Sequence, residues 1–265
     1  MRWLARLIRD AVLPPAVLLI LVAVIWDRVV VAYDLKPYLL PRPGLVAQSL
    51  WQNPLKLLGA IRYTGAAAVC GLALSLVAGT VVSFAFSQSR WLRSAGYPYA
   101  LFLQTVPIVA IAPLLVYWCG QGFQSVVLTA FIISLFPIIA GGTAGLLSVD
   151  PDLVDLFRLH NATRWQMLWK LQSPNAVPAL CTGVKTSCGL AVVGAVVGEY
   201  FAGMVGHQNG LGYLIQFHIA GLKMADLFAD VLASTALTVA MFAVVSLTTS
   251  LILERWYDAP ADHRP

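Results

Sequence analysis

Charged residues are scarce in this chain of 265 residues. Asp, Glu, Lys and Arg together make up 11% of it, whereas 59% of the residues are hydrophobic. A soluble domain carries about 25% charged residues, so this chain lacks the polar groups needed to cover a surface in water. The composition therefore excludes a soluble enzyme, a disordered protein and a fibrous repeat, and it indicates a polytopic membrane protein.

The chain also lacks the residue patterns of nucleotide and metal sites. No G-x-x-x-x-G-K-[ST] loop, which would cradle phosphates, occurs in it. The cysteines have no metal-type spacing and lie within or beside apolar runs, as small packing residues do: Cys70, Cys119, Cys181 and Cys188. The histidines are scattered, without a carboxylate or cysteine at ligand spacing: His160, His207, His218 and His263. We expect no cofactor, no metal and no catalytic residues.

Charge-free stretches give the expected membrane spans. A spanning helix needs about 20 predominantly apolar residues, and the uncharged stretch 94–149 is long enough for two of them. The sequence predicts an all-α membrane protein with six transmembrane helices, near residues 11–33, 63–87, 97–118, 124–147, 178–202 and 230–253.

The first of these spans has an alternative interpretation. Arg2, Arg6 and Arg9 precede its apolar stretch, as in a signal peptide. No small-residue cleavage site follows, and the apolar pattern resumes after Asp27 and Arg28. We therefore expect a retained span. Removal of this segment would leave five spans and an outside N-terminus.

The distribution of Lys and Arg predicts the orientation in the membrane. Cytoplasmic loops carry an excess of these residues. With the N-terminus inside, the inner segments hold Arg2, Arg6, Arg9, Arg90, Arg93, Arg158, Arg164, Lys170, Arg255 and Arg264. The outer segments hold only Lys36, Arg42, Lys56, Arg62 and Lys223. Both termini are therefore expected in the cytoplasm, and the modest net charge of +5 gives no reason to expect a nucleic-acid partner.

Two connecting segments are long. In the first, residues 34–62, the three prolines at its start, Pro37, Pro41 and Pro43, exclude one continuous helix there. The stretch after Pro43 is either an interfacial helix or, by preference, a packed outer cap. In the second, residues 148–177, acidic residues come early and basic residues late, which suits the dipole of a helix. Its helical apolar spacing, ending at Pro174, predicts one or two short amphipathic helices. These helices are either interfacial or a docking surface for a soluble partner.

The second segment is similar to a motif of importer permeases. Cytoplasmic loops of ATP-binding-cassette (ABC) importer permeases carry E-A-A-x3-G-x9-I-x-L-P. Here Asp155 falls on the Glu, Leu156 and Phe157 on the two Ala, Asn161 on the Gly, Leu171 on the Ile, Ser173 on the Leu and Pro174 on the Pro. Only the proline is identical, and bulkier side chains replace the small ones.

The flanking segments strengthen this resemblance. They resemble permeases of the nitrate/sulfonate/taurine importer group and follow one another in the order of that family: residues 39–43, 107–118, 148–153, 162–166 and 210–215. The resemblance implies a single permease domain over residues 1–265 with the MetI-like fold. It also implies an inner-membrane location among lipids, pairing as a homodimer, two ABC ATPase subunits and an extracytoplasmic substrate-binding protein. An intramembrane enzyme or a channel-like protein is the alternative.

The same resemblance assigns the ATPase-coupling residues. They are Asp155, Leu156, Phe157, Asn161, Arg164, Trp165, Leu171 and Pro174. The group transports taurine, alkanesulfonates, nitrate, bicarbonate, or heterocycles such as thiamine-type pyrimidines and riboflavin. Residues 191–200 look nearest to the heterocycle branch.

Polar and helix-breaking residues inside the spans are candidates for the transport pathway. Intramembrane charges are costly, and Glu199 either gates the outer mouth or anchors the 204–227 loop. Pro107 interrupts a backbone hydrogen bond, a break that membrane helices tolerate beside a watery cavity. Gln104 and Thr105 are therefore expected to line the pathway together with Pro107. The small residues between 183 and 198 predict that their helix lies in the bundle or at a dimer interface.

Overall fold

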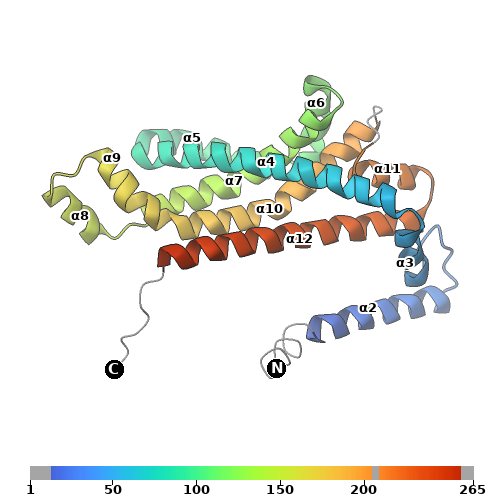
Figure 1. Ribbon diagram of the computed structural model, residues 1–265. Helices are drawn as coiled ribbons and strands as arrows, with labels where there is room; N and C mark the ends of the chain where they lie inside the picture. Colours follow the sequence, from blue (N-terminus) through green and yellow to red (C-terminus); the bar gives the residue numbers. More distant parts are fainter. Residues whose placement is uncertain (1–12, 205–208, 258–265) are drawn as a thin grey trace.

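The computed structural model describes residues 13–204 and 209–257. All of its regular structure in these residues is helical, as predicted (Figure 1). The chain order is α2 (Leu13–Ala32), α3 (Pro43–Gln52), α4 (Pro54–Gln88), α5 (Arg90–Thr105), α6 (Ile108–Cys119), α7 (Phe123–Leu147), α8 (Pro151–Leu159), α9 (Arg164–Met167), the π-helical η2 (Leu168–Gln172), α10 (Ser173–Met204), α11 (Leu211–Ala220) and α12 (Met224–Tyr257).

Four helical stretches are long and apolar enough to cross a membrane. They are Pro54–Gln88, Phe123–Leu147, Arg164–Gly203 and Met224–Arg255. The bent pair α5 and α6 gives a fifth if it is taken as one span. Helix α2 has 20 predominantly apolar residues but is not among these stretches. The count of six spans therefore stays a prediction.

Helix α7 lies at the centre of the bundle, between α4 and α10. Small residues allow the three backbones to approach closely. A Cβ on Gly71 of α4 would lie 2.6 Å from the Cβ of Ala130, and one on Gly194 of α10 would lie 2.7 Å from the Cα of the same alanine. The small residues of α10 therefore face the bundle, as their spacing predicted.

Serine hydroxyls join the same three helices. Ser75 of α4 donates a 2.7 Å hydrogen bond to the carbonyl oxygen of Phe131 and lies 2.7 Å from the hydroxyl of Ser134. From the other side, Ser187 of α10 donates to the carbonyl oxygen of Ser134 at 2.7 Å. These buried hydroxyls form hydrogen bonds with one another and with the backbone, as the interior of a membrane bundle requires.

The interval 97–118, expected to be one helix, is divided in two. Helices α5 and α6 meet at an angle of 97° across Val106 and Pro107, and α6 points away from the bundle axis in Figure 1. A proline disfavours the helical conformation in the residue before it and has no N–H of its own. Val106 accordingly adopts an extended backbone, with φ −69° and ψ 126°. Pro113 and Pro137, by contrast, stay inside α6 and α7.

Helices α4 and α12 begin earlier than the charge-free stretches suggested, at Pro54 and Met224. The added turns carry charged residues such as Lys56 and Asp226. Charges near the end of a membrane helix reach the headgroup region, so an uncharged stretch marks the hydrocarbon-spanning part and not the whole helix.

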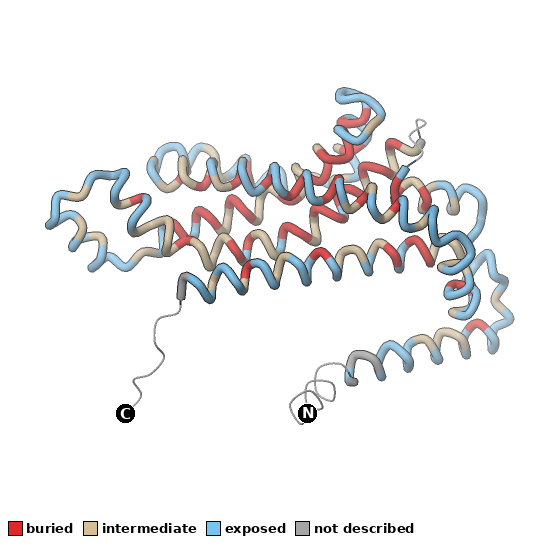
Figure 2. Tube along the Cα trace, in the orientation of Figure 1, coloured by how far each residue is buried: buried red, intermediate tan, exposed pale blue. Residues whose placement is uncertain are grey.

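The bundle has two distinct ends and an apolar flank. Helices α8 and α9 lie at one end, together with the C-terminal end of α12, while α3 and α11 lie at the opposite end (Figure 1). Figure 2 shows burial concentrated on α7, α10 and the facing side of α4. Large apolar side chains on α2 and on the outer side of α12 are exposed, as is expected of surfaces that face lipid.

Candidate functional site

Helix α8 opens the segment that resembles the permease coupling motif, residues 150–174, here named the coupling segment. The carboxylate of Asp150 accepts the backbone N–H of Asp152 at 2.9 Å, and Pro151 fills the first helical position. Both features stabilise a helix start. Asp155 and Arg158 form an exposed 3.2 Å ion pair on the next turn.

Asn161 ends α8 in the left-handed conformation, with φ +53°. The N–H of Ala162 donates to the carbonyl oxygen of Phe157 at 3.0 Å, and the N–H of Asn161 to that of Arg158 at 2.9 Å. This is the hydrogen-bond pattern of a Schellman motif, which usually has glycine at the left-handed position and sometimes asparagine. The Gly-to-Asn departure from the permease motif therefore keeps the backbone conformation that glycine serves.

Helix α9 begins at Arg164, three residues after the left-handed Asn161. The hydroxyl of Thr163 accepts the N–H of Gln166 at 3.3 Å, and the side chain of Gln166 accepts the N–H of Thr163 at 2.8 Å. This reciprocal pair is a capping box. The turn between α8 and α9 is thus fixed on both sides by local hydrogen bonds.

The prediction that Pro174 ends the helical run is wrong. Residues 164–203 continue as one helical stretch through η2 into α10, and Pro174 is the second residue of α10. The wider π-helical turn of Leu168–Gln172 changes the hydrogen-bond register just before this proline, which allows the helix to continue. Leu171 lies within that turn and is half-buried.

The coupling segment exposes apolar side chains. No residue of α8 is buried, and Leu156 is 46% exposed. Leu159 and Trp165 are more open still, at 80% and 70%, whereas Phe157 is half-buried. Since both helices project beyond the bundle (Figure 1), these side chains form an apolar surface at the end of the molecule.

The four predicted pathway residues do not form one cluster. Gln104, Thr105 and Pro107 are exposed at the break between α5 and α6, where the hydroxyl of Thr105 donates to the carbonyl oxygen of Phe102 at 2.9 Å. Glu199 is fully buried. Within residues 13–204 and 209–257, no hydrogen bond joins it to any of the other three.

The side chain of Glu199, on α10, lies against the start of α11. Its Oε2 accepts the N–H of Gly212 at 2.9 Å and the hydroxyl of Thr64 at 2.9 Å, and the Thr64 oxygen accepts the N–H of Leu211 at 2.9 Å. Side chains from α10 and α4 thereby cap the first two amides of α11. Oε1 has no hydrogen-bond partner among the described residues. A Cβ on Gly210, whose φ is +93°, would lie 2.2 Å from the Glu199 carboxyl carbon.

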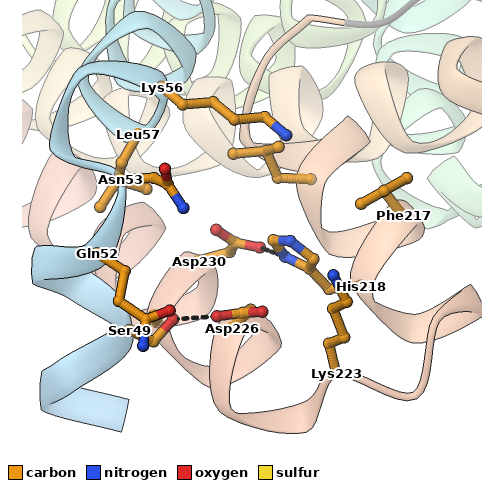
Figure 3. Close-up of a pocket in the computed structure, with 12 residues that line it drawn as sticks. Ser49, Gln52, Asn53, Lys56, Leu57, Phe217, His218, Lys223, Asp226 and Asp230 are labelled. Atoms are coloured by element: carbon orange, nitrogen blue, oxygen red, sulfur yellow. Dashed lines mark hydrogen bonds and ion pairs between the residues drawn. The ribbon is translucent and has the colours of Figure 1, made fainter.

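A polar pocket at the α3 and α11 end was missed by the sequence analysis. It is a cavity of about 210 Å³, here named the charged pocket, and is shown in Figure 3. Its polar lining residues are Ser49, Gln52, Asn53, Lys56, His218, Lys223, Asp226 and Asp230. The signal available in the sequence was the pair of aspartates four residues apart, which share one helix face. The other members come from distant segments.

Two hydrogen bonds cross the charged pocket. The Nδ1 of His218 and a carboxylate oxygen of Asp230 lie 2.6 Å apart, and both side chains are mostly buried. The hydroxyl of Ser49 donates to the carboxylate of Asp226. Together these contacts tie α3 and α11 to the first turns of α12. Among the residues that the structure describes, no group of three or more His, Cys, Asp and Glu side chains could hold a metal ion.

Comparison with known proteins identifies the fold and the family. Residues 71–259 match the family described as "Binding-protein-dependent transport system inner membrane component". The chain is similar to an inward-facing structure of the MetNI methionine ABC transporter, with a TM-score of 0.61 at 17% identity, over 76% of this chain and 96% of that one. This likeness shows the MetI-like permease fold.

Three curated relatives are similar over most of their length. The riboflavin transport system permease protein RibX of Chloroflexus aurantiacus is 35% identical over 91% of this chain and 88% of its own. The formylaminopyrimidine transport permease protein ThiX of Halalkalibacterium halodurans is 29% identical over 91% and 95%. The taurine transport system permease protein TauC of Escherichia coli is 28% identical over 82% and 79%.

Proposed function

Because the chain belongs to the family of binding-protein-dependent transport system inner membrane components and is a permease subunit of an ABC importer, we propose that its coupling segment receives the ATPase. The exposed apolar surface of α8 and α9 is the observation that carries this proposal. Buried apolar anchors supply most of the energy of a protein interface. Leu156, Phe157 and Trp165 would be the anchors, and Arg164 would contact an acidic rim of the ATPase.

The hydrogen-bonded ends of α8 and α9 support the same proposal. A surface that transmits force from a moving ATPase must keep its shape when it is pushed. The Schellman motif around Asn161 and the capping box of Thr163 fix the turn between the two helices by local hydrogen bonds. The continuous helix through Leu171 and Pro174 then connects this turn directly to α10, which packs against α4, α7, α11 and α12.

The orientation follows from this assignment. ATP is in the cytoplasm, so the coupling segment lies on the cytoplasmic side, in agreement with the excess of Lys and Arg predicted there. The C-terminal end of α12 lies at the same end of the bundle (Figure 1). We therefore place both termini inside, and the α3, α11 and charged-pocket end outside.

The assembly that we propose contains two copies of this chain, two ATPases and one extracytoplasmic binding protein. The path would run along the break at Val106 and Pro107, with Gln104 and Thr105 exposed to it. Discontinuous membrane helices are tolerated where they border a watery cavity. Multi-angle light scattering of the complex purified with its ATPase tests the stoichiometry. A single permease per complex would contradict the proposal.

We propose a polar heterocycle as the solute, of the class of riboflavin or a thiamine-type pyrimidine. The relatives RibX and ThiX each align with 91% of this chain, whereas TauC aligns with 82%. Sulfonates such as taurine are the second candidate, favoured by the similarity to TauC.

Reconstitution distinguishes these solutes. Proteoliposomes with the permease, its ATPase and its binding protein should take up labelled riboflavin or formylaminopyrimidine when ATP is supplied on the ATPase side. Taurine is the comparison solute. Uptake of taurine alone would overturn the solute class, and flux that persists without the ATPase would contradict the importer mechanism in favour of a channel.

A further inference from the structure

The charged pocket takes no part in the ATPase coupling proposed above. It lies at the opposite end of the bundle from the coupling segment, between α3, the start of α4, α11 and the start of α12 (Figures 1 and 3). Its volume of about 210 Å³ leaves room for a polar side chain with several waters, since a water fills about 30 Å³ in the liquid.

The two carboxylates of the pocket are already occupied by partners within the chain. Asp230 is bonded to His218 at 2.6 Å, with its side chain only 4% exposed. Asp226 accepts the hydroxyl of Ser49. Each aspartate therefore has a hydrogen-bond partner within the chain that helps to hold it in the pocket wall.

The two lysines of the pocket are not paired in this way. In residues 13–204 and 209–257, neither Lys56 nor Lys223 has a carboxylate within ion-pair distance. Both are exposed. In Figure 3 Lys56 enters from the top of the view and Lys223 from the bottom, with the His218–Asp230 pair between them. The open groups of the pocket thus include two ammonium donors.

The side chain of Lys56 and the backbone of Lys223 each contact α11. The ammonium of Lys56 lies 5.3 Å from the centre of the Phe217 ring, a cation–π contact. The backbone N–H of Lys223 donates to the carbonyl oxygen of His218 at 3.0 Å, at the end of α11. An arriving anion would therefore meet one ammonium group, that of Lys56, whose position is already restricted, which lowers the entropy lost on binding.

We infer that the charged pocket receives a carboxylate side chain of the extracytoplasmic binding protein, paired with Lys56 and Lys223. This inference rests on the proposed function, which places this end of the bundle outside. An Asp or Glu side chain fits the cavity, complements the open ammonium groups and leaves the internal aspartate bonds intact. Such charged contacts steer association and fix the orientation of the partner. A free small carboxylate could pair with the same lysines, and the test below distinguishes it from a side chain of the binding protein.

The test uses a carbodiimide, which couples a carboxylate to an amine only where the two are in contact. The complete permease–ATPase complex in nanodiscs is mixed with its purified, ligand-loaded binding protein and treated with the reagent. Mass spectrometry should then find Lys56 or Lys223 joined to an acidic residue of the binding protein. Lys36, which pairs with Asp34 at 3.1 Å outside the pocket, should give no such product.

Binding measurements provide the second arm. Lys56→Met combined with Lys223→Met should weaken the affinity for the binding protein about tenfold at low salt and less at high salt, because exposed charges are screened. The control Lys36→Met removes one lysine of the same end and should change the affinity by less than about twofold, within the range of an exposed ion pair.

The outcomes separate this inference from the proposed function. If the wild-type complex assembles with its ATPase and binds the binding protein, but the double variant binds equally well, the pocket is not the contact. Competition by millimolar acetate without any cross-link to the binding protein identifies a small-anion site and also overturns the inference. Failure of the wild-type chain to assemble with the ATPase would instead refute the proposed function.

Discussion

The hydroxyl of Thr64 on α4 donates a 2.9 Å hydrogen bond to Oε2 of Glu199 on α10, across 135 positions of sequence. The same hydroxyl oxygen accepts the N–H of Leu211 at the start of α11. One threonine thus joins three helices. Because both side chains are fully buried, water cannot replace these bonds when either residue is changed.

Substitutions of Glu199 test whether its carboxylate anchors α11. We predict that Glu199→Gln nearly preserves the thermal midpoint of the purified protein, because a carboxamide oxygen can still accept from Gly212 and Thr64. Glu199→Ala leaves both donors unpaired, at a cost of about 1–3 kcal/mol for each buried group, and should lower the midpoint clearly. Glu254→Ala, an exposed carboxylate of α12, is the matched control.

Uptake by the same variants distinguishes an anchor from a gate. If Glu199 only anchors α11, the uptake rate per folded molecule of Glu199→Gln should equal that of the wild type. A normal midpoint combined with altered uptake would show that the negative charge itself takes part in gating.

Gly212 tests how closely α11 approaches α10. A Cβ at this position would lie 2.0 Å from the carbonyl oxygen of Val196 and 2.7 Å from the Cβ of Glu199, so Gly212→Ala must displace α11 and break the Glu199 bond. We expect a loss of several kcal/mol, comparable to overpacking plus an unpaired buried group. Thermal unfolding measures this loss.

Gly59→Ala is the control for that substitution. Gly59 lies in α4, and a Cβ there would have no atom within 4 Å. Alanine is favoured over glycine inside a helix by about 1 kcal/mol, so Gly59→Ala should leave stability unchanged or raise it. Equal destabilisation of both variants would show that the close contact of α11 with α10 is not formed.

Asn161 tests the left-handed turn of the coupling segment. Asn161→Gly should be tolerated, because glycine adopts positive φ readily. Asn161→Val introduces a β-branched side chain at φ +53° and should cost about 1–2 kcal/mol. That cost should appear as reduced copurification of the ATPase with a normal level of the protein in the membrane. Wild-type copurification of the valine variant would show that the angle between α8 and α9 does not matter for docking.

The apolar surface of the coupling segment is tested by charged substitutions. Leu156→Asp or Phe157→Asp should abolish transport-coupled ATP hydrolysis while membrane insertion stays normal, because a charge in a buried anchor position opposes docking. Leu55→Asp, at an 84% exposed leucine of the opposite end, should leave copurification of the ATPase unchanged. If neither coupling variant affects copurification or uptake, the ATPase docks elsewhere.

Arg164 tests the rim of the same surface. Arg164→Ala should weaken ATP-dependent uptake by a smaller factor, several-fold at most, because rim charges tune the encounter rate more than the affinity. The deficit should be larger at low salt, where the charge is less screened. Uptake measured across a salt series gives the result, and a deficit independent of salt would argue for a packing role of Arg164.

The coupling segment shows what local sequence can predict. The early aspartates, Pro151 and the helical apolar spacing foretold short amphipathic helices, because caps and periodicity act within a few residues. The alignment of Asn161 with a motif glycine agrees with its left-handed φ. The end at Pro174 was wrong, because the π-helical turn just before this proline allows the helix to continue into α10.

The composition and the long charge-free stretches determined that the chain is an all-α membrane protein. So few charges cannot cover a soluble surface, and stretches of about 20 apolar residues span a membrane as helices. Only the tertiary structure decided which helices meet and what the polar residues do. The bend at Pro107, the capping of α11 by Glu199 and Thr64, and the union of Ser49, His218 and Asp230 each depend on contacts between distant segments. A linear pattern records the period of a helix but not its neighbours, so those partners could not be read from sequence spacing.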